Sequence, residues 1–129
     1  MREMYACALV GIGGFFGSIC RYLLARFSAS LLGISFPYGT FIINVSGSFV
    51  LGVLATLVGD KYFPSSDQIR LLLAVGFLGA YTTFSTFEYE THALLEDGGW
   101  FLAMANIFGS VFLGLVAVRL GIVFARFCL

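Results

Sequence analysis

The chain has 129 residues, of which 60% are hydrophobic and only 11% are charged, and its seven basic and seven acidic residues cancel. Soluble domains carry about 25% charged residues, so a chain this poor in charge, with a mean hydropathy of +0.99, cannot cover a water-facing surface. The lack of a basic excess argues against nucleic-acid binding, and the composition predicts an all-α integral membrane protein forming a single domain over residues 1–129.

The first predicted membrane helix covers residues 4–27. Residues 4–20 carry no charge and contain no clear small-x-small cleavage site, so we expect a retained helix rather than a removed signal peptide. Arg21 lies toward the far end of this span. A charge at the bilayer centre costs at least ~2.5–3.5 kcal/mol, whereas near an end the side chain reaches the headgroups. Arg21 is therefore either a snorkelling side chain or a fixed positive charge that attracts anions into a vestibule.

The second predicted helix covers residues 38–59. The uncharged run 27–59 is too long for one span of roughly 20 residues, and "GISFPYGT" at 33–40 indicates a turn within it. Asn44 lies inside the second span, where an unpaired amide is costly. Its side chain either hydrogen-bonds another helix or presents its two N–H donors to an anion, and the residues alone leave both alternatives open.

The third predicted helix, residues 67–95, follows a polar loop at 59–68 and contains "GFLGAYTTFSTF" at 76–87. The ordinary interpretation is a continuous helix whose hydroxyls bond their own backbone. The alternative is a break, because Gly76 and Gly79 lower helix stability and the hydroxyls compete for backbone groups. Carbonyls freed by a break at membrane depth would form a cation site.

Phe84 and Phe87 are spaced i, i+3 and therefore share one face of this helix. In a chain with 15 phenylalanines, packing is the default role for both rings. The edge of a phenyl ring nevertheless carries partial positive charge and can contact an anion without holding it tightly. Ser85 and Thr86 would add O–H donors beside the rings, as a dehydrated anion requires.

The fourth predicted helix, residues 100–126, follows "EDGG" at 96–99. Four spans place both termini on one side of the membrane. The basic residues then show a small bias, with Arg2, Lys61, Arg70 and Arg126 on that side and Arg26 and Arg21 on the other, while Arg119 falls within the fourth span and is not counted. Such a small bias permits insertion in both orientations.

Small residues spaced four apart let helices approach closely. Three such pairs are present: Gly13 and Gly17, Ser48 and Gly52, Ser110 and Gly114. Packing within one chain can use all of them. We still expect a homo-oligomer, because four helices leave little room for a pore inside one subunit.

Enzymatic chemistry is not predicted. No nucleophile, base and orienting acid stand at useful spacing, and no nucleotide-binding glycine pattern is present. The cysteines Cys7, Cys20 and Cys128 are odd in number and widely spaced, and His92 is the only histidine, so we expect no metal site built from these residues.

Three segments resemble the CrcB/Fluc family of fluoride channels: "GGFFGSICRY" at 13–22, "GTFIINVSGSFVLG" at 39–52 and, most specifically, "GFLGAYTTFSTFEYE" at 76–90. The resemblance covers nearly the whole chain. It implies passive, fluoride-selective export from the cytoplasm across a bacterial inner membrane, which protects the cell from fluoride. It also implies an antiparallel, dual-topology homodimer with two pores along its interface and a break in the third helix.

The same resemblance implies roles for individual residues. The fluoride pathway would be lined by Asn44, Phe84, Phe87, Ser85, Thr86 and Ser110. Arg21 and Glu90 would lie in the vestibule and beyond the pore motif. The backbone carbonyls of Gly79 and Thr82 would hold a structural Na⁺ at the dimer centre.

Two residues depart from the family pattern. Ala80 stands where glycine is frequent, and Glu88 stands where serine is common. The negative charge of Glu88 near a pore mouth would lower the rate of anion entry rather than change the identity of the protein.

Two rival functions remain. A small multidrug-type exporter, also of four helices, would need an acidic residue in the first span, and residues 4–20 contain none. A non-transporting membrane scaffold would explain the small residues but not the clustering of Asn44, hydroxyls and glycines.

Overall fold

The structure, a computed structural model, describes residues 1–59 and 66–128. The predicted loop at 59–68 falls largely on residues 60–65, so that loop and Lys61 lie outside the described residues. All regular secondary structure in the described residues is helical. The elements are α1 (Arg2–Leu32), α2 (Tyr38–Gly59), α3 (Ser66–Ile69), the π-helix η1 (Arg70–Leu78), α4 (Gly79–Tyr81), α5 (Phe84–Glu96) and α6 (Trp100–Cys128).

Four helical stretches of the described chain are long and apolar enough to cross a membrane: Arg2–Leu32, Tyr38–Gly59, Asp67–Glu96 and Trp100–Cys128. The prediction of an all-helical, multi-pass membrane protein is therefore confirmed. Three of the spans agree closely with the predicted ranges. The first continues to Leu32 instead of residue 27, because "FSASLL" contains no helix breaker and the chain leaves the helix only at Gly33, with φ 81°. Arg21 consequently lies in the interior of α1 rather than near its end.

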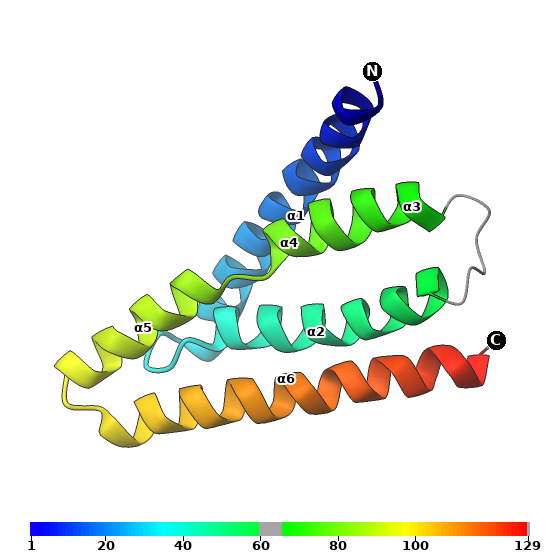
Figure 1. The fold of residues 1–129 in the computed structure, drawn as a ribbon. Helices are drawn as coiled ribbons and strands as arrows, with labels where there is room; N and C mark the ends of the chain where they lie inside the picture. Colours follow the sequence, from blue (N-terminus) through cyan, green and yellow to red (C-terminus); the bar gives the residue numbers. More distant parts are fainter. Residues whose placement is uncertain (60–65, 129) are drawn as a thin grey trace.

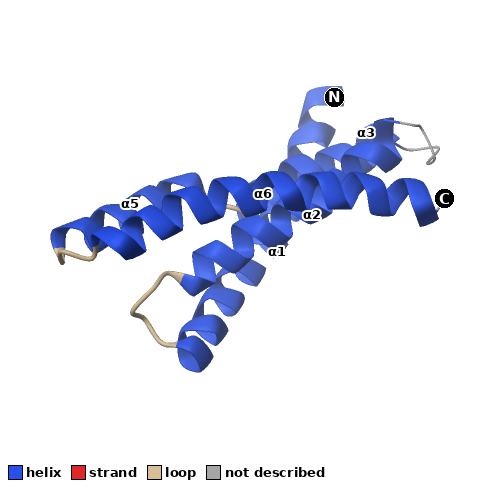
Figure 2. Ribbon diagram, turned by 90° about the horizontal axis from the view of Figure 1, so that it is seen from below, coloured by secondary structure: helices blue, strands red, loops and turns tan. Residues whose placement is uncertain are grey.

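The helices form two packed pairs. α2 runs along α6 in the same direction, while α1 crosses η1 and α4 and also contacts α2 (Figure 1). Both chain ends lie toward one end of the bundle, and the α5–α6 turn lies at the other (Figures 1 and 2). The second span, α2, contacts η1, α4 and α5 of the third span, in which α4 ends at Tyr81 and α5 begins at Phe84.

Glycines bring the backbones of both pairs into contact. Gly13 and Gly17 of α1 lie against η1, and a Cβ on Gly17 would collide with the carbonyl oxygen of Phe77. In the other pair, a Cβ on Gly52 of α2 would collide with the carbonyl oxygen of Val118 in α6. The small residues identified in the sequence thus serve close helix packing within one chain.

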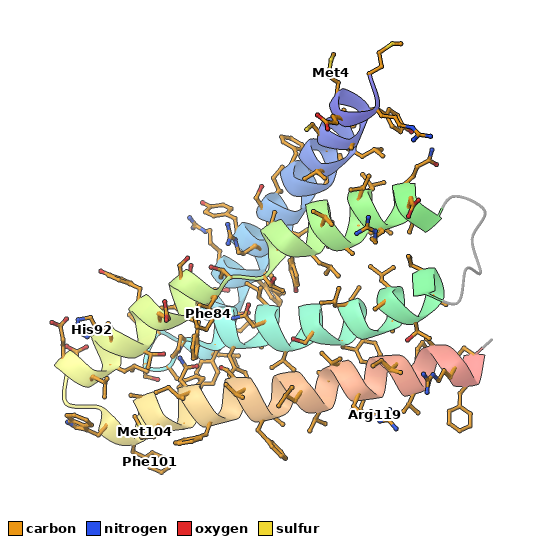
Figure 3. The ribbon with its side chains drawn as sticks, in the orientation of Figure 1. Met4, Phe84, His92, Phe101, Met104 and Arg119 are labelled. Atoms are coloured by element: carbon orange, nitrogen blue, oxygen red, sulfur yellow. The ribbon has the colours of Figure 1, made fainter. Side chains whose placement is uncertain are left out.

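Large apolar side chains cover the outside of the bundle. Phe101 is 83% exposed, and it points away from the bundle near the start of α6 (Figure 3). Phe108 and Phe112, further along the same helix, are 68% and 66% exposed. Because lipid tails solvate such surface at no cost, this exposure is typical of a membrane protein.

Candidate functional site

The site is organised by two residues of extended backbone between α4 and α5. Thr82 has φ −79° and ψ 158°, and Thr83 has φ −152° and ψ 120°. The Thr82 hydroxyl donates to the carbonyl oxygen of Leu78 at 2.9 Å, which competes with helix continuation. The Thr83 hydroxyl oxygen accepts from the backbone N–H of Thr86 at 3.3 Å and so caps the start of α5. The threonines of the run explain where one helix ends and the next begins.

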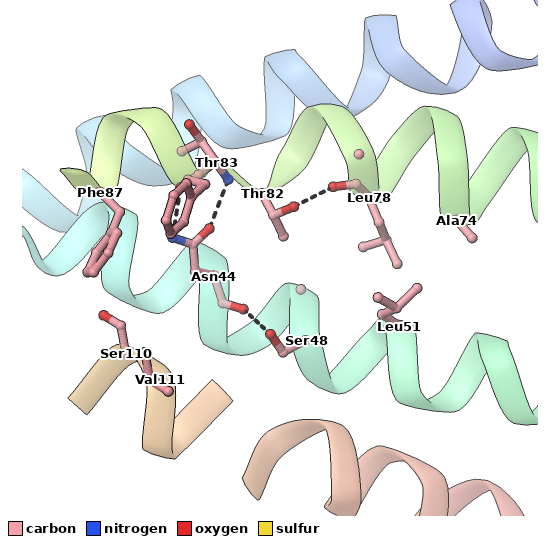
Figure 4. A pocket seen from close by; sticks show the side chains of 13 residues that line it. Asn44, Ser48, Leu51, Ala74, Leu78, Thr82, Thr83, Phe87, Ser110 and Val111 are labelled. Atoms are coloured by element: carbon pink, nitrogen blue, oxygen red, sulfur yellow. Dashed lines mark hydrogen bonds between the residues drawn. The ribbon is translucent and has the colours of Figure 1, made fainter. Parts of the chain in front are cut away.

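Asn44 of α2 pairs with the backbone of Thr83. Its Nδ2 donates to the Thr83 carbonyl at 3.0 Å, and the Thr83 N–H donates to its Oδ1 at 2.9 Å (Figure 4). These two bonds satisfy both backbone polar groups of Thr83, a residue that has left the helical ladder. Of the two alternatives for Asn44, the structure contains the hydrogen bond between helices, and the second N–H of the amide has no acceptor among the described residues.

A cavity of about 360 Å³ opens beside this pairing, and α2, η1, α4, α5 and α6 all contribute to its wall. Asn44, Phe87 and Ser110 project toward it from three different helices (Figure 4). The structure therefore brings six of the predicted residues together. The lining residues are Asn44, Gly47, Ser48, Leu51, Ala74, Leu78, Gly79, Thr82, Thr83, Phe84, Phe87, Ser110 and Val111.

The two phenylalanine rings of α5 lie side by side at the cavity. Their centroids are 5.7 Å apart and their planes differ by 35°. Phe87 is half-buried, whereas Phe84 is 71% exposed in the single chain. The ring pair thus reaches from the cavity to the outer surface of the protein.

Four predicted residues are not part of this cavity wall. Ser85 is exposed, and the Thr86 hydroxyl oxygen accepts from the Thr83 hydroxyl at 3.0 Å. Arg21 is half-buried on α1. Glu90 lines a second cavity, of about 260 Å³, which is walled mainly by α1, α2, α5 and the α1–α2 connection. Its Oε2 is buried without a hydrogen-bond partner among the described residues.

The carbonyls of Gly79 and Thr82 have lost the donors that a continuous helix would supply. In such a helix the N–H of Thr83 would bond Gly79, but it bonds Asn44 instead. The N–H of Thr86 would bond Thr82, but it bonds the Thr83 hydroxyl. Both carbonyl groups belong to residues that line the cavity, and the described residues contain no cluster of three His, Cys, Asp or Glu. The ligands available to a cation here are therefore backbone carbonyl oxygens, which suit a hard ion such as Na⁺.

Asn106, which is 1% exposed in α6, is not among the residues predicted from the sequence. Its Nδ2 donates to the Thr91 hydroxyl oxygen at 2.8 Å, and its Oδ1 accepts from the Ser110 hydroxyl at 3.3 Å. The Thr91 hydroxyl in turn donates to the carbonyl of Phe87 at 2.7 Å. A usable signal was present, since Asn106 is an amide in an uncharged span, one helical turn before Ser110.

Comparison with known proteins gives consistent matches. Residues 8–122 match the family described as "CrcB-like protein, Camphor Resistance (CrcB)". A relative from Solibacter usitatus is 48% identical over 118 residues, which cover 92% of this chain and 96% of the relative. One from Geotalea daltonii is 43% identical over 130 residues, covering 96% and 99%. Both relatives are named "Fluoride-specific ion channel FluC".

Proposed function

The chain belongs to the CrcB family, and on this premise we propose that it is a fluoride-selective passive channel that exports fluoride from the cytoplasm and protects the cell from its toxicity. The names of the relatives support the choice of ion. The observation that carries the mechanism is the cavity at the helix interruption, where an amide, two phenyl rings and a hydroxyl meet.

The direction of transport follows from acid–base chemistry and the membrane potential. Neutral HF crosses lipid and dissociates in the less acidic cytoplasm, which traps the anion inside. An inside-negative potential then drives fluoride outward, by about 2.3 kcal/mol per charge for each 100 mV. A passive pore in the inner membrane suffices, and no step requires bond chemistry from the protein.

Selectivity rests on donors that are polar but uncharged. A dehydrated fluoride needs hydrogen-bond donors, yet it must not be held too tightly to leave. The free N–H of Asn44 and the hydroxyl of Ser110 can donate, and the edges of Phe84 and Phe87 carry partial positive charge. A narrow path between the rings disfavours the larger chloride.

The working unit is an antiparallel, dual-topology homodimer with two pores along its interface. Phe84 is 71% exposed in the single chain although it lines the cavity, which is itself open to the outer surface. A second copy would cover this ring and complete the wall. Ser85 is also exposed, so its hydroxyl contributes to the pathway only beside a partner copy. The small bias of the basic residues toward one side permits insertion in both orientations.

A structural Na⁺ at the dimer centre would be held by the carbonyls of Gly79 and Thr82. This role is supported by the N–H groups of Thr83 and Thr86, which bond side chains instead of these two carbonyls. The ion would offset the negative C-terminal end of the helical stretch formed by η1 and α4.

The remaining predicted residues act away from the cavity wall. Arg21 supplies a fixed positive charge that raises the local concentration of anions. Thr86 extends the row of hydroxyls that starts at Thr83. Glu90 lines the second cavity, beyond the ring pair.

Growth under fluoride stress tests the proposed function in cells. A bacterial strain without a fluoride exporter should grow in fluoride medium when it expresses this chain, and empty vector is the control. No rescue by protein shown to be in the membrane would contradict the proposal. Gained resistance to a cationic drug instead would favour the multidrug-type alternative.

A further inference from the structure

Hydroxyl side chains in the described helices mostly donate to the backbone of their own helix. Ser48 donates to the carbonyl of Asn44 at 2.7 Å, and Thr56 donates to that of Gly52 at 2.9 Å. Ser110 differs, because its hydroxyl donates to the side-chain Oδ1 of Asn106 at 3.3 Å. Its bond is longer than these backbone bonds and therefore weaker.

The hydrogen bond that the Thr91 hydroxyl donates determines which way the Asn106 amide is oriented. The Thr91 hydroxyl has one proton, which it donates to the carbonyl of Phe87 at 2.7 Å. Its oxygen must therefore accept from Asn106, which places the amide nitrogen toward Thr91 and the amide oxygen toward Ser110. Because Asn106 is 1% exposed and bonded on both sides, the amide is held in this orientation.

We infer that Asn106 is a positioning residue that keeps the Ser110 hydroxyl off its own backbone and available to fluoride. The inference rests on the proposed function. Ser110 lines the cavity and Asn106 does not, so Asn106 acts through Ser110. An arriving anion displaces a long, weak hydrogen bond at little cost, and the hydroxyl returns to the amide oxygen when the anion leaves.

Loss of the amide should fold the hydroxyl back onto the helix. In Asn106→Leu, Ser110 would bond the backbone carbonyl of residue 106, in the geometry that Ser48 adopts with Asn44. The half-saturating fluoride concentration for efflux from liposomes should then rise roughly tenfold, since a hydrogen bond to a charged group is lost. Ser110→Ala should give a similar rise, and the double variant should show no further rise.

The double variant separates positioning from a general structural effect. If Asn106→Leu raises the half-saturating concentration by the same factor with and without the Ser110 hydroxyl, the inference is wrong. A drop in maximal flux alone, at unchanged half-saturation, would also overturn it. Asn106→Ala removes the amide without adding apolar volume, so it replaces the leucine variant in the same cycle should that variant not fold. If the unsubstituted protein releases no fluoride, the proposed function fails and the inference fails with it.

Discussion

The pairing of Asn44 with Thr83 can be tested by removing the amide while keeping the shape of the side chain. Asn44→Leu would delete both hydrogen bonds and leave the N–H and C=O of Thr83 unpaired. A buried polar group without a partner costs about 1–3 kcal/mol. Two such groups at a part-buried site should lower the free energy of unfolding by roughly 2–4 kcal/mol.

Unfolding by denaturant in detergent micelles measures this loss, and hydrogen exchange at the Thr83 amide locates it. The amide should be protected in the unsubstituted protein and should exchange faster in Asn44→Leu. Thr56→Val is a matched control on the same helix, because the Thr56 hydroxyl bonds only its own backbone at Gly52. It should change stability by less than about 1 kcal/mol. Unchanged stability together with unchanged exchange in Asn44→Leu would refute the structural role of the pairing.

Two further predictions concern the rings and the helix contacts. Phe84→Ile and Phe87→Ile should each reduce fluoride flux severely, because isoleucine has no electropositive ring edge, while Phe108→Ile on the outer face of α6 should leave flux unchanged. Unreduced flux in both ring variants would remove the rings from the mechanism. Gly17→Ala should prevent α1 from packing on η1, since its Cβ would meet a backbone oxygen, and thermal unfolding in detergent should show a large loss. Gly11→Ala, whose Cβ meets nothing within 4 Å, should instead be neutral or stabilising by up to about 1 kcal/mol; equal behaviour of the two glycine variants would contradict the packing argument.

The helical spans could be predicted because charge and turn residues divide this chain clearly. The uncharged runs locate the helices, and "GISFPYGT" separates the first two. The end of α1 was misplaced because Arg26 looks like a boundary, whereas the backbone of an arginine continues a helix readily. Only the left-handed conformation at Gly33 ends it. The sequence Arg70–Leu78 carries no local signal that predicts the π-helical course of η1.

The sequence indicated some residues of the candidate site but none of its hydrogen bonds. Asn44, Phe84 and Phe87 were candidates from their own chemistry and Ser110 from the family resemblance, and these four line one cavity, whereas Ser85, Thr86, Arg21 and Glu90 do not. Whether Asn44 would face an anion or another helix depended on where the backbone at Thr83 lies, which is a tertiary property. Asn106 was overlooked for the same reason, because its importance comes from its contacts rather than from its own neighbours in sequence.

Ion release from liposomes tests the central claim most directly. The purified protein would be reconstituted in liposomes loaded with potassium fluoride, with valinomycin to carry the counter-ion and a fluoride electrode to follow release. A parallel preparation would be loaded with chloride. Rapid fluoride release with little chloride release is the predicted result. Release no faster than from empty liposomes, by protein shown to be folded and dimeric, would contradict the account.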